Sequence, residues 1–92
     1  MSYQVRMTPA AEKDFKGLAK AVRVQVAKQL RRLAEDPRPP GAARVRSRPS
    51  GDYRVQVGSY RVGYEINDEQ QTVTVWQIGD RKRFYDRAKR RR

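Results

Sequence analysis

The chain lacks the two side chains on which much of protein chemistry depends. None of its 92 residues is cysteine, which excludes disulfide cross-links, thiolate nucleophiles and cysteine-ligated metals. None is histidine either, so the imidazole that usually transfers protons near neutral pH is missing. Any chemistry must therefore use tyrosine, lysine, arginine or carboxylate groups.

Acidic residues and long apolar runs are also scarce. Ten Asp and Glu stand against 22 Lys and Arg, which gives a net charge of +12. No apolar run has the length of a membrane span or of a signal-peptide core. No group of ligand residues has metal spacing, and no glycine-rich phosphate loop occurs. We expect one cytoplasmic domain, residues 1–92, without cofactor, metal or membrane contact.

The positive charge is concentrated in two segments. Residues 37–64 hold six arginines and one acid, and residues 81–92 hold eight bases and one acid. The intervening residues 65–80 hold four acids and no base. Such a field attracts polyanions, so nucleic acid is the first partner to consider. An acidic protein partner satisfies the same charge, and the two are compatible.

A repeated Gly-x-Tyr-Arg phrase marks the centre of the chain, at residues 51–54 and 58–61. Apolar and polar residues alternate on both sides of Gly58-Ser59, which predicts two strands joined by a tight hairpin. Counting outward from the turn pairs Val57 with Tyr60, then Gln56 with Arg61, Val55 with Val62 and Arg54 with Gly63. One face of this hairpin is apolar.

The opposite hairpin face is polar and basic. It carries Arg54, Gln56 and Arg61, and Gly63 is expected to leave open space beside Arg54. Two arginines on a rigid surface next to a gap are suited to hold a phosphate group.

The N-terminal half predicts a strand at residues 3–7 followed by helix. Thr8 is a candidate N-cap and Pro9 a first helical residue. Apolar spacing is helical from residue 11 to 33, so residues 9–35 form either one helix or a hairpin of two. The proline-rich segment 36–41 ends it.

After residue 41 we expect a short edge strand at 43–46, the hairpin, a turn at 67–70 and a third strand at 71–78 ended by Gly79. Val73 and Val75 indicate one inward parity and Trp76 and Ile78 the other, which a bulge would reconcile. Residues 80–92 predict a short helix that frays into a basic tail at 88–92. This order predicts an α+β two-layer fold: strand, helices, antiparallel meander and final helix.

These features together resemble the RelE/ParE superfamily of bacterial type II toxins. The resemblance rests on the hairpin phrase, on Asp-Pro-Arg-Pro after the helical segment and on Ile78-Gly79-Asp80-Arg81 followed by a late tyrosine. It covers the chain from about Tyr3 to Ala88. It implies a RelE-like, microbial-ribonuclease type of fold in which residues 9–35 are two helices broken near Lys20.

The resemblance implies two alternative activities. RelE-type members cut mRNA in the ribosomal A site without metal, which would make this chain an endoribonuclease whose partners are the ribosome and mRNA. ParE-type members inhibit DNA gyrase and cut no RNA. In both groups a cognate antitoxin neutralises the toxin.

The resemblance also assigns roles to residues. In RelE-like ribonucleases the positions of Arg54, Arg61, Arg81 and Tyr85 are catalytic, and Gln56 contacts RNA. Arginines would hold the phosphate, Arg81 would stand near the leaving oxygen, and Tyr85 would act as base or stacking platform. We assign further RNA contacts to the neighbouring bases: Arg44, Arg46, Arg48, Lys82 and Arg83.

Two positions depart from the RelE pattern. Gln56 replaces a residue that is often basic, and an amide orients a phosphate oxygen without adding charge. Asp80 stands beside Arg81 where a base is common, and it could pair with that arginine. The site is thus strong in electrostatic stabilisation and poor in proton-transfer groups, because arginine holds its proton too tightly to shuttle it.

Overall fold

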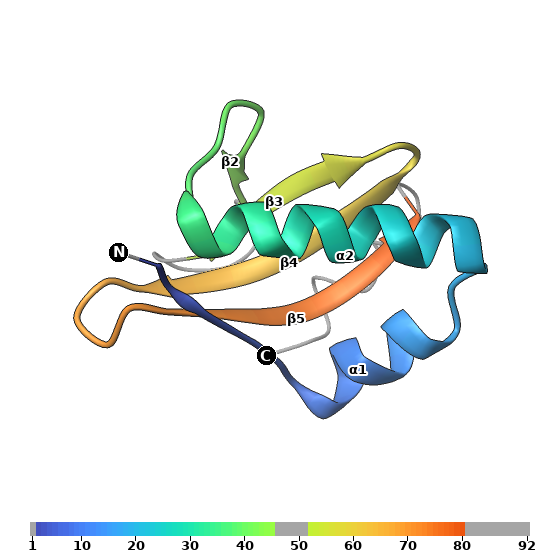
Figure 1. Cartoon of the computed structure of the whole chain (residues 1–92), viewed down its shortest axis with the longest axis horizontal. Coiled ribbons are helices and arrows are strands. Elements are labelled where there is room, and N and C mark those ends of the chain that lie inside the picture. Colours follow the sequence, from blue (N-terminus) through green and yellow to red (C-terminus); the bar gives the residue numbers. More distant parts are fainter. Residues whose placement is uncertain (1, 46–51, 81–92) are drawn as a thin grey trace.

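The computed structural model describes residues 2–45 and 52–80, in which two helices cover one side of a five-stranded sheet (Figure 1). The elements in chain order are β1 (Gln4–Met7), α1 (Pro9–Lys16), α2 (Lys20–Glu35), β2 (Ala43–Arg44), β3 (Asp52–Val57), β4 (Tyr60–Asn67) and β5 (Thr72–Asp80). This confirms the α+β two-layer fold. The helix and basic tail expected after residue 80 lie outside the described residues.

The sheet is mixed, with strand order β1-β5-β4-β3-β2. Strands β2 to β5 form the expected antiparallel meander, and β1 pairs in parallel with β5 from Gln4 opposite Thr72 to Met7 opposite Val75. The sequence predicts β1 but not its partner, because a parallel pair is joined through a crossover rather than through a local turn.

The central hairpin has the register that its sequence predicts. Val57 pairs with Tyr60, and the three pairs beyond it follow in the expected order up to Arg54 opposite Gly63. Gly58 has a φ of +59°, the left-handed backbone that a two-residue turn requires and that glycine adopts without a steric penalty. Turn chemistry and alternation therefore suffice to fix this part of the sheet.

A bulge in β5 resolves the parity conflict of the third strand. Gly63 pairs with Gln77 while its neighbour Tyr64 pairs with Val75, so Trp76 is the extra residue. Val75 and Ile78 consequently both face the core, and Trp76 does not belong to that cluster. The strand continues through Asp80, so the prediction that Gly79 ends it is wrong.

Two helices, rather than one, follow β1. The Thr8 hydroxyl caps α1 by accepting a hydrogen bond from the Ala11 amide at 3.2 Å, and α1 ends at Gly17. Helix α2 begins at Lys20, as the family resemblance implies. The Asp14 carboxylate accepts a hydrogen bond from the Ile78 amide at 3.1 Å, which joins α1 to β5.

The core lies between the helices and the sheet. Apolar residues of α1 and α2 pack on the inward side chains of β3, β4 and β5. The buried members of this core include Ala11, Val26, Leu30, Leu33, Val55, Val62, Tyr64, Ile66, Val73, Val75 and Ile78. Because successive side chains on a strand point to opposite faces, the alternate residues project from the side of the sheet away from the helices.

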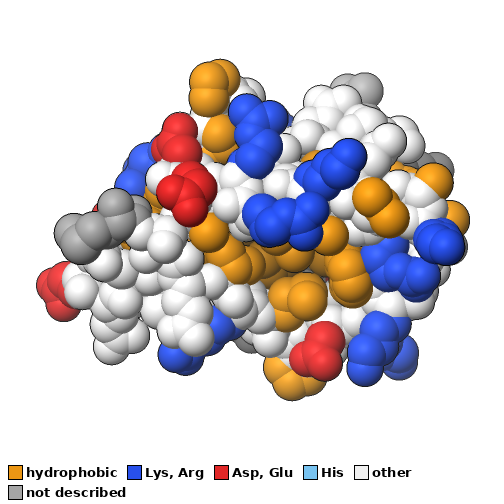
Figure 2. All heavy atoms as spheres, viewed as in Figure 1, with side chains coloured by type: hydrophobic (Ala, Val, Ile, Leu, Met, Phe, Trp, Pro, Cys, Tyr) orange, Lys and Arg blue, Asp and Glu red, His pale blue; other side chains and the backbone are white. Residues whose placement is uncertain are grey.

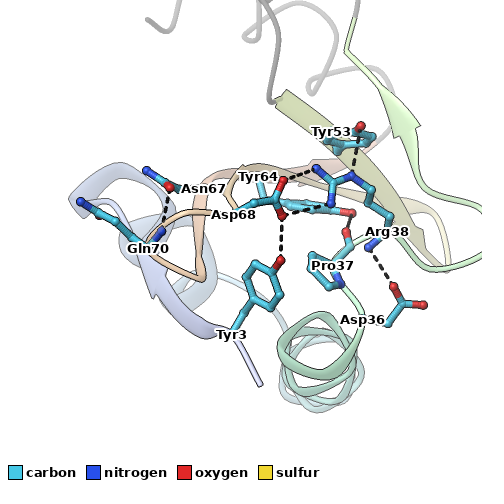
Figure 3. Close-up of polar contacts among 9 residues, drawn as sticks. All are labelled: Tyr3, Asp36, Pro37, Arg38, Tyr53, Tyr64, Asn67, Asp68 and Gln70. Atoms are coloured by element: carbon cyan, nitrogen blue, oxygen red, sulfur yellow. Dashed lines mark hydrogen bonds and ion pairs between the residues drawn. The ribbon is translucent and has the colours of Figure 1, made fainter. Parts of the chain in front are cut away.

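A polar cluster at one end of the molecule joins three distant segments (Figure 3). Arg38 binds Asp68 through two hydrogen bonds of 3.3 and 3.0 Å, and the Tyr3 hydroxyl donates to the same carboxylate at 2.7 Å. The guanidinium also lies over the Tyr53 ring, 5.4 Å from its centroid. Beneath it the buried Tyr64 hydroxyl donates to the Pro37 carbonyl at 2.7 Å.

Neither of the helices within the described ranges has the length and hydropathy needed to cross a membrane.

Candidate nucleic-acid interface

The sheet face turned away from α1 and α2 brings together residues from three strands. We call it the rear sheet face and define it by two cross-strand rows: Arg54, Gly63 and Gln77, then Gln56, Arg61 and Gly79. Paired side chains in neighbouring antiparallel strands lie about 4.5–5.5 Å apart at Cβ. The predicted convergence of Arg54, Gln56 and Arg61 on one face is therefore confirmed, while their roles in catalysis and RNA binding stay predictions.

Arg61 is the most enclosed cation on this face. Its side chain lies in the middle of the sheet, and the residue is only 7% exposed. Nη1 donates to the neighbouring Tyr60 carbonyl at 3.4 Å, and Nε is buried without a hydrogen-bond partner among the described residues. A buried donor without an acceptor is costly, so this guanidinium would gain from an anionic oxygen placed beside it.

Gln56 and Arg54 are more accessible than Arg61. Gln56 is exposed, and its amide donates to the Gly58 carbonyl at 2.7 Å, so the side chain folds back along the turn. Arg54 is half-buried on the same strand. The face therefore offers one accessible guanidinium, one amide and one enclosed guanidinium.

The expected open space at Gly63 is absent. Gly63 is buried, and so is Trp76, which forms a second apolar cluster with Val45. Strands β3 and β4 separate β5 from the segment that follows β2, so this cluster extends across the rear side of the sheet. Alternation shows which face Gly63 lies on, but it does not show whether neighbouring side chains cover that position.

Register separates two other residues from this face. Arg44 is exposed and pairs with Tyr53, so it projects from the side opposite to Arg54 at the β2 edge. Asp80 pairs with Tyr60 and shares the parity of Ile78, which faces the helices. Asp80 therefore does not project toward Arg61. The predicted role of Arg44 in RNA binding stays a prediction.

Several predicted site residues lie outside the described residues: Arg46, Arg48, Arg81, Lys82, Arg83 and Tyr85. Their roles also stay predictions.

The rear sheet face contains two buried polar residues that sequence reasoning missed. Gln77 is fully buried in the row with Arg54, and Asp52, only 4% exposed, has the parity of Arg54 and Gln56 on β3. The alternation of β3 could have placed Asp52. Gln77 could not be placed, because its face depends on where in β5 the bulge falls.

The described residues contain no group of three or more Cys, His, Asp or Glu side chains arranged to hold a metal ion. Besides the buried Asp52 carboxylate, the rear sheet face carries guanidinium and amide donors, which bind anionic oxygens and stabilise negative charge.

Residues 5–85 match the family model described as the ParE toxin of the type II toxin–antitoxin system parDE. The chain belongs to the RelE/ParE superfamily of type II toxins. A protein of Escherichia coli described as RelE-like is 30% identical to the toxin over 83 residues, which are 90% of this chain and 87% of that protein. The match confirms the family that the hairpin phrase indicates.

Solved RelE structures share the fold of the toxin. RelE in the intact E. coli RelBE complex superposes with a TM-score of 0.75 at 30% identity, covering 86% of this chain and 96% of that one. The isolated E. coli RelE toxin superposes with a TM-score of 0.76 at 26% identity, covering 97% and 98%.

Proposed function

We propose that the toxin is an endoribonuclease that cuts mRNA in the ribosomal A site and acts through its own side chains rather than through a metal. The observation that carries this proposal is the convergence of Arg54, Gln56 and Arg61 on one rigid sheet face. A strand surface that holds two guanidinium groups near one amide is suited to a phosphodiester.

The proposed reaction is an internal transesterification. The ribose 2′-oxygen attacks the adjacent phosphorus, the bond to the 5′-oxygen breaks, and a 2′,3′-cyclic phosphate forms. Arg54 and Arg61 stabilise the negative charge that grows on the phosphate oxygens. The burial of Arg61 strengthens this interaction, since a guanidinium in a low-dielectric setting acts on a nearby charge more strongly than one in water.

Proton transfer is the demanding part of this reaction for the toxin. The 2′-hydroxyl must lose a proton and the 5′-oxygen must gain one. We assign the first step to Tyr85 and the stabilisation of charge near the leaving oxygen to Arg81. A catalyst with so few proton-transfer groups depends on the ribosome to complete its geometry.

We also propose that a cognate antitoxin neutralises the toxin. The E. coli RelE relative was solved in a toxin–antitoxin complex, and its chain aligns with 86% of this one.

Gyrase inhibition without cleavage is the second candidate. Two observations favour it: Gln56 adds no charge and folds back onto Gly58, and Arg61 is largely enclosed. The matching family model also carries the ParE description.

Growth arrest by site variants tests the nuclease assignment. Arg54→Ala and Arg81→Ala should each abolish the arrest caused by expression of the toxin, and circular dichroism should show an intact fold. Lys13→Ala, which removes one exposed charge on α1, is the matched control and should remain toxic. Full toxicity of both arginine variants would disprove the phosphate roles, and inhibited supercoiling by the purified toxin would then support the gyrase alternative.

A further inference from the structure

The solvent-facing side of α2 carries a line of bases on the helical side of the molecule. Four exposed residues form it, and we call them the α2 basic stripe: Lys20, Lys28, Arg31 and Arg32. At 1.5 Å of rise per residue, Lys28 lies about 12 Å and Arg31 about 16 Å along the helix from Lys20. Figure 2 shows blue side chains along this helix, with acidic ones gathered toward one end.

These bases have no acidic partners within residues 2–45 and 52–80. The ion pairs there join Lys16 to Glu12 and Arg38 to Asp68, and neither involves α2. Glu35, in the last turn, is the one acid in the sequence of the helix. The stripe is therefore a positive surface that the described part of the protein does not neutralise.

Helix stability does not account for this arrangement. Lys20 occupies the first residue of α2, where the helix dipole disfavours a cation, and the first turn contains no acid. Lys28 repels Arg31 and Arg32 at the i+3 and i+4 positions. Helix α1 follows the opposite rules, with a Thr8 cap, Glu12 in its first turn and a Glu12–Lys16 pair. The contrast indicates that the charges on α2 serve an external partner.

We propose that the α2 basic stripe binds the phosphate backbone of double-stranded RNA. The helix orders these cations in a row with a rise of about 1.5 Å per residue, and an ordered row of cations suits a regular duplex backbone. Helix α2 has no aromatic residue on which unpaired bases could stack, as single-strand binding surfaces have. Its one strongly exposed hydrophobic residue is Val24, at 48%, a small anchor for a protein interface.

The position of the stripe gives it a role distinct from cleavage. The sheet separates it from Arg54 and Arg61, so the two surfaces contact different phosphates. A toxin with both surfaces holds structured RNA on one side and presents its rear sheet face to the mRNA on the other. The presentation of the rear sheet face to mRNA rests on the proposed function, whereas duplex binding by the α2 basic stripe does not.

The test measures binding of the whole toxin to a 2′-O-methyl RNA duplex of about 16 base pairs over a range of salt concentrations. This probe cannot be cut by 2′-hydroxyl attack, so the result is independent of catalysis. The variant K28Q/R31Q should reduce the slope of log K against log salt by about 2, because each lost phosphate contact lowers it by about 1. The control K13Q/K16Q removes two exposed helical charges at the same spacing and should leave the slope unchanged.

Two results would overturn the proposal. An equal reduction of the salt slope in K28Q/R31Q and K13Q/K16Q would show that net charge alone attracts the duplex. An unchanged slope in K28Q/R31Q would show that the stripe contacts no RNA and would direct attention to an acidic protein. R54A keeps the stripe and should bind the uncleavable duplex with a slope reduced less than in K28Q/R31Q, whereas its effect on growth arrest tests the nuclease, so failure of one claim does not imply failure of the other.

Discussion

At the scale of single residues, Arg61 is costly to bury and is suited to bind an anion. It is 7% exposed, and its Nε has no hydrogen-bond partner in the part of the chain that the structure describes. Charged groups are seldom kept in such a setting for stability, because burial without a complete set of partners is unfavourable. The unfavourable burial of this guanidinium is explained if the group binds an anionic ligand.

Arg61→Met separates these two roles. The apolar replacement removes the unpaired donor, so the free energy of unfolding should stay the same or rise, by up to about 1–3 kcal/mol. Growth arrest should be lost. Urea unfolding and a growth assay measure the two quantities, and a variant that is both destabilised and toxic would contradict the account of this residue.

Tyr64 supports the sheet from within the core. Its ring is fully buried and stacks on Tyr53 with centroids 6.1 Å apart, and burial raises its pKa to about 12. Because the pKa is higher in the folded state, the contribution to stability is complete below pH 10 and is lost as the pH rises toward 12.

Tyr64→Phe should therefore remove part of the alkaline loss of stability. At neutral pH it should cost about 1 kcal/mol, since the hydrogen bond to the Pro37 carbonyl is lost and that acceptor is left buried. Denaturant unfolding of both proteins at several pH values measures the difference. Parallel curves for the two proteins between pH 10 and 12 would refute the assignment.

At the scale of elements, the contact between α1 and β5 lies next to the candidate site. Strand β1 pairs with β5 only as far as Val75, and beyond it the Asp14 carboxylate accepts from the Ile78 amide. The Asp14 side chain thus accepts the hydrogen bond that a neighbouring strand would otherwise accept, and this contact holds the C-terminal end of β5.

Asp14→Ala should destabilise the protein by about 1.5–3 kcal/mol, because a charged acceptor is removed from a backbone amide. Asp14→Asn keeps an acceptor oxygen and should retain much of the stability. Amide hydrogen exchange at Ile78 should quicken in the alanine variant alone. Equal exchange in both variants would show that the carboxylate does not hold this strand end.

The sequence predicts elements best where local rules decide them. The hairpin register follows from Gly58-Ser59 and strict alternation, and the start of α1 follows from Thr8 and Pro9. The break between α1 and α2 could not be derived from periodicity, since the apolar spacing stays helical across Gly17. That break is set by packing, because the two helices cover different parts of the sheet (Figure 1).

The candidate site was predictable to the same extent. Alternation placed Arg54, Gln56 and Arg61 on one face, but it could not show that Arg61 and Gly63 are buried. Burial depends on packing across the whole sheet, and the bulge at Trp76 changes which residues of β5 share a face. Long-range packing of this kind has no signature in local spacing.

At the scale of the whole molecule, the cluster around Asp68 joins β1, the segment after α2 and the β4–β5 turn. Hydrogen bonds from Arg38, and secondarily from Tyr3, lower the pKa of the Asp68 carboxyl. Because this pKa is lower in the folded state, the contribution is present above the ordinary value of 3.8 and is lost as the pH falls through the folded-state value.

Asp68→Asn should thus be less stable than the parent protein at neutral pH, and the difference should shrink in acid and in high salt. The effect should be small, since the cluster is exposed and water screens it. Thermal unfolding at pH 7 and below pH 3, each at two salt concentrations, measures it. A difference that persists in acid would contradict an electrostatic origin.

Basic residues lie on both sides of the sheet, and the net charge of +12 attracts polyanions. We propose that this charge serves cleavage on the ribosome. Primer extension on a reporter mRNA, incubated with purified toxin in a reconstituted translation system with or without ribosomes, tests this proposal directly. We expect cuts at A-site codons only when ribosomes are present; the absence of cuts in both conditions would contradict the nuclease assignment.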